Sequence, residues 1–258
     1  MSQDYFELKG KTALITGASS GLGAHFAGLL ASEGVHVIIA ARRTDRLAEQ
    51  LEQIKSQGGS ARAIAMDVTD NDSVLNAFQS IAHTEGRLDI LVNNAGVGDD
   101  PKKFLNTDEA DWAWQMQTNL DGAWRVAREA SRLMVRTDTA GAIINIASIY
   151  GHNTGAMKVA YNVSKAGVMQ LTKSMSIELC RNNIRVNSLC PGWFLTEINQ
   201  AYFATESGER YVKGIPMRQL GEYSDLNVPL LLLASNKAGR YMTGSAVSVD
   251  GGISESPI

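Results

Sequence analysis

A tyrosine and a lysine stand four residues apart at Tyr161 and Lys165, a spacing that could support acid–base chemistry. On a helix, residues i and i+4 lie above one another on the same face. An ammonium beside a phenol favours the phenolate, so it lowers the tyrosine pKa from its usual value of about 10 toward neutral pH. Such a tyrosine can act as a general acid. The alternative is a structural pair, in which the lysine stem covers a half-buried ring.

A second hydroxyl is expected at the same place. Residues 142–147 form a short, apolar, β-rich run, and Ser148 follows it directly. Open parallel sheets bind ligands at the carboxyl ends of their strands. The loop between Ser148 and Tyr161 is long enough to fold back and bring both hydroxyls to one point.

The segment from Gly17 to Gly23 carries glycines at the spacing G-x-x-x-G-x-G. It follows the β-rich run Thr12–Thr16 and precedes an amphipathic segment at 24–32. Glycines let the chain turn sharply and approach a ligand, and the free N–H groups of a new helix favour a diphosphate. A tight structural turn is the alternative. The position after the first strand of an alternating pattern favours a dinucleotide site.

The rest of the chain alternates between β-rich runs and helical segments. We expect further strands near residues 35–41, 61–66, 88–92, 184–189 and 246–249. We expect helices near residues 44–57, 108–135 and 225–234, and from Tyr161 to about residue 180. This alternation predicts an α/β fold with a doubly wound, Rossmann-type parallel sheet of about seven strands and helices on both faces. No repeat or linker divides residues 1–258, so a single domain is the simplest interpretation.

Composition excludes several other classes of protein. The 258 residues are 44% hydrophobic and 20% charged, with a net charge of −3 and no basic cluster, so no nucleic-acid partner is expected. Cys180 and Cys190 belong to no cluster typical of disulfide frameworks or zinc sites. No apolar run is long enough to cross a membrane, and the first residues do not resemble a signal peptide. A cytoplasmic location is the default expectation.

Together these motifs resemble the short-chain dehydrogenase/reductase family from end to end. The family's motifs occur here in order: residues 16–23, Asp67, the turn from Asn93 to Gly96, Asn119, Ser148, Tyr161 with Lys165, and Pro191-Gly192 followed by Thr196.

The resemblance implies a nicotinamide cofactor and metal-free interconversion of a carbonyl and an alcohol. It implies that Tyr161 protonates the carbonyl oxygen and that Ser148 hydrogen-bonds the same oxygen. Lys165 would bind the ribose and keep the phenol acidic, while Asn119 would anchor a water for proton resupply. The cofactor contacts implied by position are Gly17, Ser19, Ser20, Leu22, Gly23, Arg42, Arg43, Asp67, Val68, Asn94, Gly96, Tyr161, Lys165, Pro191, Gly192, Phe194 and Thr196. Among these, Asp67 and Val68 would contact adenine, Asn94 the adenosine ribose side, and Phe194 with Thr196 the carboxamide.

The end of the second strand predicts which dinucleotide is accepted. NAD sites place an acid there, about 20 residues beyond the glycine turn, to bind the ribose 2′-hydroxyl. This chain instead has Arg42 and Arg43, and no acid lies between Val35 and Thr44. Guanidinium groups can bind a 2′-phosphate, which predicts NADPH with Arg42 as the dominant contact. The alternative is that both arginines only solvate a surface turn.

We therefore expect an NADPH-dependent carbonyl reductase similar to 3-oxoacyl-carrier-protein reductases. Two alternatives remain: an NAD-dependent polyol or sugar dehydrogenase, and a catalytically silent regulator or scaffold. Aromatic residues from Trp193 to Tyr211 predict a mobile substrate lid around residues 193–215 and an apolar ketone or β-keto (thio)ester as substrate. Those rings could instead pack against a neighbouring subunit. The family resemblance also suggests a homotetramer.

Overall fold

The computed structural model describes residues 4–98, 101–195 and 199–255. Within them a seven-stranded parallel sheet has the order β3-β2-β1-β4-β5-β6-β7, which confirms the predicted fold class. The strands are β1 (Thr12–Thr16), β2 (His36–Ala41), β3 (Ser60–Ala65), β4 (Ile90–Asn93), β5 (Gly141–Ile146), β6 (Ile184–Pro191) and β7 (Ala246–Val249).

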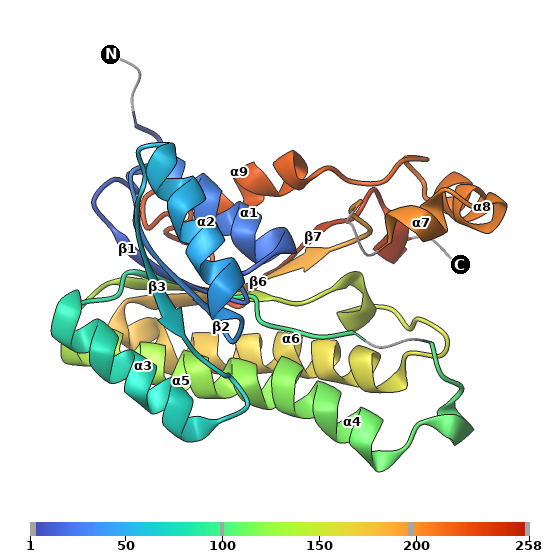
Figure 1. Cartoon of the computed structure of the whole chain (residues 1–258), viewed down its shortest axis with the longest axis horizontal. Helices are drawn as coiled ribbons and strands as arrows, with labels where there is room; N and C mark the ends of the chain where they lie inside the picture. The colour runs from blue at the N-terminus through green and yellow to red at the C-terminus, as the bar shows by residue number, and fades with distance from the viewer. Residues whose placement is uncertain (1–3, 99–100, 196–198, 256–258) are drawn as a thin grey trace.

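Helices cover both faces of the sheet (Figure 1). Helices α1, α2 and α9 lie on one face, and α3 to α6 lie on the other. The α-helices are α1 (Gly21–Ser32), α2 (Thr44–Ser56), α3 (Asn71–Thr84), α4 (Glu109–Gln115), α5 (Gly122–Arg136), α6 (Val159–Leu179), α7 (Gln200–Phe203), α8 (Glu206–Gly214) and α9 (Asn227–Ala234). Short 3₁₀ turns are η1 (Phe104–Asn106), η3 (Ile149–Gly151), η4 (Cys180–Asn182), η5 (Tyr223–Leu226) and η6 (Ile253–Glu255).

The central strands are mostly apolar because both of their faces are buried. In β1, Leu14 packs into the core beneath α3 and α5, and its neighbour Ile15 packs into the core beneath α1 and α2. Both side chains are fully buried. Successive side chains of a strand point to opposite faces, so a strand covered on both sides reads as a continuous hydrophobic run.

The strand order reverses direction between β1 and β4, which places a crevice at their carboxyl ends. Thr16 ends β1, and its Oγ1 accepts hydrogen bonds of 2.9 Å from the backbone N–H groups of Asn94 and Ala95, just beyond β4. These two bonds fix the glycine turn against the segment after β4. The glycine turn at residues 17–23 and the turn from Asn93 to Gly96 therefore meet at the same edge of the sheet.

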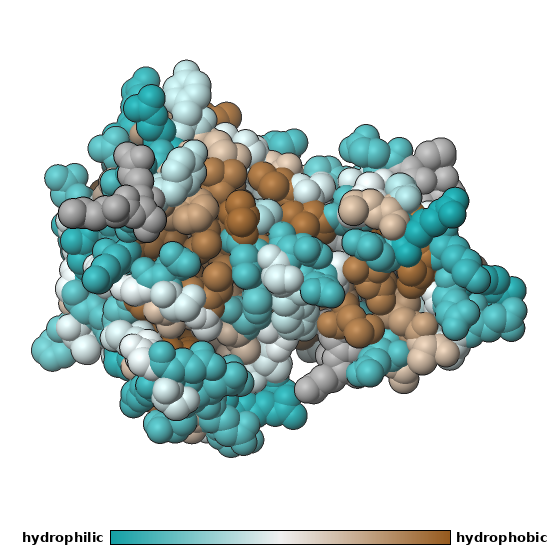
Figure 2. All heavy atoms as spheres, turned by 90° about the horizontal axis from the view of Figure 1, so that it is seen from above, coloured by the Kyte–Doolittle hydropathy of each residue, from teal (hydrophilic) through white to brown (hydrophobic). Residues whose placement is uncertain are grey.

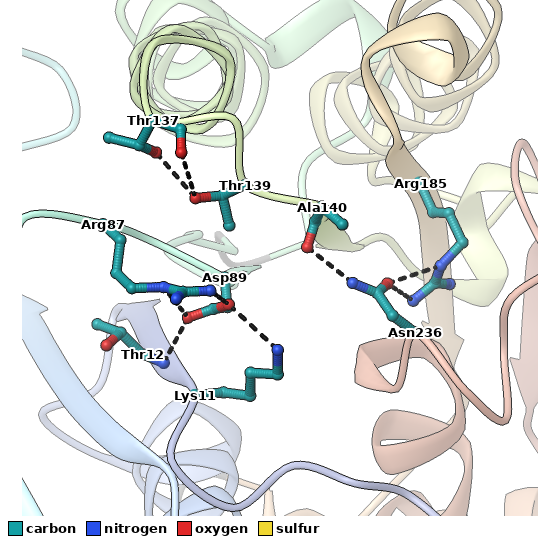
Figure 3. A network of polar contacts seen from close by, with 9 residues as sticks. All are labelled: Lys11, Thr12, Arg87, Asp89, Thr137, Thr139, Ala140, Arg185 and Asn236. Carbon is teal, nitrogen blue, oxygen red and sulfur yellow. Dashed lines mark hydrogen bonds and ion pairs between the residues drawn. The ribbon is translucent and has the colours of Figure 1, made fainter.

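A polar network closes the opposite edge of the sheet (Figure 3). The buried Asp89 carboxylate accepts from the backbone N–H of Thr12 at 2.9 Å and forms an ion pair with Arg87. Nearby, Arg185 donates to Asn236 Oδ1 and to the carbonyls of Leu233 and Ser235. These contacts join the strand starts to the segment after α9, so they serve the fold rather than the crevice.

The structure corrects one predicted element and refines another. The helix expected over 108–135 is interrupted by a π-helical turn, η2 (Met116–Asp121), between α4 and α5. The segment expected as a lid contains α7 and α8. None of the described helices is long and apolar enough to span a bilayer, and no described group of His, Cys, Asp and Glu could hold a metal ion.

Candidate active site

Ser148, Tyr161 and Lys165 line one cavity of about 350 Å³ at the carboxyl edge of the sheet. Ser148 follows β5, and the first turns of α6 carry the other two residues. The loop between β5 and α6 folds back as the sequence predicts. One wall of the cavity therefore presents two hydroxyls and an ammonium.

Lys165 is held in a defined position within this wall. Its side chain is only 5% exposed, and Nζ donates to the backbone carbonyl of Ile146 at 2.9 Å. The ammonium lies 5.7 Å from the centre of the Tyr161 ring. A fixed cation beside a phenol is the arrangement that the i, i+4 spacing predicts.

Burial dominates the electrostatics of the pair. Desolvation raises the pKa of Tyr161, and a hydrogen bond with the Ser148 side chain acts against that rise. Desolvation also lowers the pKa of Lys165 to about 8. The sequence-based expectation of a lowered tyrosine pKa is not met in this structure, because burial destabilises the phenolate. The phenol is therefore protonated at neutral pH, as a proton donor must be.

Asn119 lies in the π-helical turn η2 rather than in a regular helix, and it lines neither this cavity nor the one beside it. Its Oδ1 accepts from the Val97 N–H at 2.7 Å, and its Nδ2 donates to the Val97 carbonyl at 2.9 Å and to Ser164 Oγ at 3.1 Å. The amide thus joins η2, α6 and the loop after β4. π-Helical turns occur frequently at functional sites, and they explain how a poor helix former sits at the middle of a long helical segment.

A second cavity of about 400 Å³ continues from the first along the same edge. Both are lined by Leu22, Asn94, Gly96 and Val97, so the two form one trough. The second cavity is also lined by the predicted residues Gly17, Ser19, Ser20, Arg42, Arg43, Asp67 and Val68. An elongated trough that starts at the N-terminus of α1 and ends at a proton donor fits a dinucleotide cofactor.

The glycine turn needs small residues for close packing as well as for lining the trough. A Cβ atom on Gly23 would lie 2.4 Å from the Gly17 carbonyl oxygen and 2.5 Å from Asn94 Nδ2. Asn94 Nδ2 donates to the Thr16 carbonyl at 2.9 Å. Gly23 does not line the trough. It is required because the turn and the segment after β4 are in direct contact.

The two arginines after β2 have different surroundings. Arg43 donates from Nη2 to the hydroxyls of Ser19 and Ser20, each at 3.0 Å. Arg42 is 60% exposed and lies 3.9 Å from the Asp67 carboxylate. Both guanidinium groups therefore stand at the rim of the second cavity, and no acid is present on β2 to repel a phosphate.

Some predicted contacts lie elsewhere, and others were missed. Pro191 and Gly192 line the first cavity, whereas the Phe194 side chain lines a separate cavity beyond it. Thr196 lies outside the described residues. Tyr150 and Lys158 line the first cavity without having been predicted. Only proximity in sequence to Ser148 and Tyr161 could have indicated them.

Comparison with known proteins agrees with this geometry. A family model described as enoyl-(acyl carrier protein) reductase matches residues 17–254. The chain is 36% identical to a 3-oxoacyl-[acyl-carrier-protein] reductase of Staphylococcus aureus, over 94% of this chain and 98% of that one.

Solved structures also resemble this chain along nearly its whole length. A short-chain type dehydrogenase/reductase from Mycobacterium marinum is 37% identical with a TM-score of 0.90, covering 96% of this chain and 97% of that one. A gluconate 5-dehydrogenase from Burkholderia cenocepacia, in complex with NADP and tartrate, is 32% identical with a TM-score of 0.93, covering 98% and 99%.

Proposed function

This chain belongs to the short-chain dehydrogenase/reductase family, and on that premise we propose that it is an NADPH-dependent ketoreductase that interconverts a ketone and a secondary alcohol. The observation that carries the proposal is the single cavity lined by Ser148, Tyr161 and Lys165, continuous with a trough that runs to the glycine turn and the two arginines after β2. A scaffold or regulator would have no need of this cavity. The chain is an oxidoreductase of this family.

The nicotinamide cofactor supplies the hydride, and the cavity wall handles the oxygen. As negative charge develops on the carbonyl oxygen, the Ser148 hydroxyl donates a hydrogen bond to it, and Tyr161 transfers its phenolic proton. The cation of Lys165 stabilises the phenolate that remains. Hydride addition and proton transfer together convert the ketone to the alcohol, and the reverse sequence oxidises the alcohol.

The phenol must regain its proton before the next turnover. Lys165 is a titratable group next to Tyr161, and its pKa of about 8 lies close to neutral pH. Asn119 fixes the neighbouring loop through Val97 and reaches α6 through Ser164. We assign these two residues to proton resupply, in keeping with the family resemblance.

The cofactor preference is proposed from charge. Arg42 and Arg43 line the adenosine end of the trough, and β2 carries no acid that could hold a ribose 2′-hydroxyl. A solved relative contains NADP. Both observations support NADPH over NADH.

The substrate is proposed to be an apolar ketone or a β-keto (thio)ester, because the aromatic side chains of Tyr150 and Trp193 line the same cavity. A second candidate is a hydroxy acid, which two observations favour. Lys158 places a cation in the same cavity, and the Burkholderia cenocepacia relative holds tartrate. A panel of β-keto esters, aryl ketones, gluconate and polyols, followed through NADPH oxidation or NADP⁺ reduction, separates the two. A preference for gluconate would show that the substrate is a hydroxy acid and not an apolar ketone or β-keto (thio)ester.

Tyr161→Phe is the direct test of the chemistry. The substitution keeps the ring and removes the proton donor, so turnover should fall by about a hundredfold to ten-thousandfold. NADPH affinity, measured by fluorescence titration, should be retained. Turnover within tenfold of the wild type would exclude Tyr161 as the acid.

A further inference from the structure

Trp193 stands between two cavities. The substrate cavity and a separate cavity of about 240 Å³ share only this residue among the described residues that line them. The second of these, which we call the rear cavity, lies between β7 and the segment after α8 and is lined in part by Phe194, Ile215, Leu220 and Val249. Trp193 therefore lies where the two cavities meet.

The Trp193 side chain is held by polar and aromatic contacts. Trp193 Nε1 donates to the Tyr211 hydroxyl at 2.8 Å, which ties the indole to α8. Its ring makes edge-on contacts with Tyr150, Phe203 and Tyr211 at centroid distances of 6.3, 5.6 and 5.8 Å. Edge-to-face pairs at these distances are favourable, so these contacts favour one orientation of the indole.

The rear cavity has an apolar interior although two acids line it. Asp225 accepts from the Glu222 N–H at 2.9 Å, and both Asp250 carboxylate oxygens accept backbone N–H groups, from Gly252 and Ser254, at 2.9 Å. These carboxylates cap backbone turns. Gln219 adds one more polar side chain, but most of the side chains that line the cavity are apolar. A mostly apolar lining suits an alkyl chain better than a sugar or a phosphate.

Backbone contacts hold the rear cavity open. The Gly221 N–H donates to the Trp193 carbonyl at 2.9 Å, and the Met217 N–H donates to the Gly251 carbonyl at 3.1 Å. Toward this end of the molecule, hydrophobic residues show at the surface, bordered by hydrophilic residues at the tip (Figure 2). The cavity thus exists before any ligand arrives.

We propose that Trp193 is a specificity-determining residue, which closes off a preformed alkyl subsite and so limits the substituent beside the substrate carbonyl to a short group. The inference rests on the proposed function, since it concerns the ketone which that function reduces. The rear cavity would hold an unbranched alkyl chain, and the Trp193 indole would block the path of that chain from the substrate cavity.

The test uses ethyl β-keto esters whose alkyl group next to the ketone grows from methyl to butyl and heptyl. The wild type should show kcat/KM falling along the series. Trp193→Ala should raise the heptyl-to-methyl ratio of kcat/KM at least tenfold, because burying each added methylene is worth about fourfold. Leu220→Trp, added to Trp193→Ala, should refill the rear cavity and return the ratio to the wild-type value.

Two measurements separate failure of this inference from failure of the proposed function. Trp114→Ala removes an exposed tryptophan outside both cavities and should leave the ratio unchanged. Octanol binding, measured by calorimetry without cofactor, should tighten at least tenfold in Trp193→Ala. If no variant reduces any ester, the proposed function is wrong, and tighter octanol binding still supports the subsite. Equal loss of activity for all esters with unchanged octanol binding would overturn the inference.

Discussion

Burial of the Lys165 ammonium lowers the stability of the folded protein. Its pKa falls from 10.5 to about 8 on burial, which corresponds to about 3 kcal/mol of unfavourable free energy at neutral pH. A neutral apolar side chain would avoid this cost but would leave the Ile146 carbonyl without its hydrogen bond, a loss of about 1 kcal/mol. The cation is thus kept at a cost in stability, which is consistent with a functional role.

Lys165→Met should therefore stabilise the fold while removing turnover. The neutral side chain avoids the desolvation cost, so we expect the free energy of unfolding at pH 7 to rise by about 2 kcal/mol. Between pH 8 and 10.5 the unfolded wild type binds a proton that the folded state has lost, so wild-type stability increases with pH. The advantage of the variant should accordingly shrink across that window. Urea unfolding at pH 7 and at pH 10 measures both effects.

Lys173 provides the matched control, because it lies exposed on the same helix. Lys173→Met should change the free energy of unfolding by less than about 0.5 kcal/mol. A Lys165→Met variant that is less stable than the wild type at pH 7 would show that the ammonium is not a stability cost.

Arg42→Asp should reverse the cofactor preference. Hydrogen bonds to charged groups contribute about 1.5–3 kcal/mol each, so the loss of one should weaken NADPH affinity about tenfold to a hundredfold. The new carboxylate can instead accept from a ribose 2′-hydroxyl. Kinetics with NADPH and NADH should show kcat/KM shifting toward NADH. Arg46→Asp makes the same change of charge on α2 outside the trough and should leave the preference intact. Equal wild-type kcat/KM for the two cofactors would contradict the assignment.

The junction of β1 and α1 requires a glycine at position 23 for packing. An alanine at Gly23 would place its Cβ against the backbone oxygen of Gly17, an atom that cannot move aside without distorting the turn. Gly23→Ala should lower the free energy of unfolding by about 1–3 kcal/mol and weaken NADPH binding. A Cβ atom on Gly28, in the same helix, would have no neighbouring atom within 4 Å. Gly28→Ala should raise stability by up to about 1 kcal/mol. Thermal unfolding with and without NADPH distinguishes the two, and equal effects would be inconsistent with the clash.

The order and type of the strands and helices could be predicted because local sequence determines them. Apolar runs such as Thr12–Thr16 end at glycine, and the alternation predicts a parallel sheet. The π-helical turn around Asn119 could not be predicted, since it depends on hydrogen bonds to Val97 and Ser164 that are distant in sequence. Tyr150 reaches the cavity only because the chain folds back after Ser148. Tertiary contacts decided these features, and no local pattern encodes them.

At the scale of the whole molecule, exposed apolar side chains on the outer helices favour assembly. Trp112 on α4, Trp124 on α5 and Ile177 on α6 are 39%, 45% and 77% exposed. Helices α4 and α6 pack together, as do α5 and α6, on the same side of the sheet (Figure 1). Large apolar residues on adjacent exposed helices are typical of interfaces. They support the homotetramer that the family resemblance suggests, with these helices pairing across a two-fold axis.

Ile177→Glu should separate the subunits across that axis. In a symmetric pair the substitution places one charge from each subunit in an apolar interface, where an unpaired charge costs several kcal/mol. Light scattering coupled to gel filtration should show a tetramer for the wild type and a smaller species for the variant. Gln53→Glu adds the same charge at an exposed position on α2, on the other face of the sheet, and should leave the mass unchanged. A wild type that is a stable monomer with full activity would exclude the tetramer, and the exposed tryptophans would then need another partner.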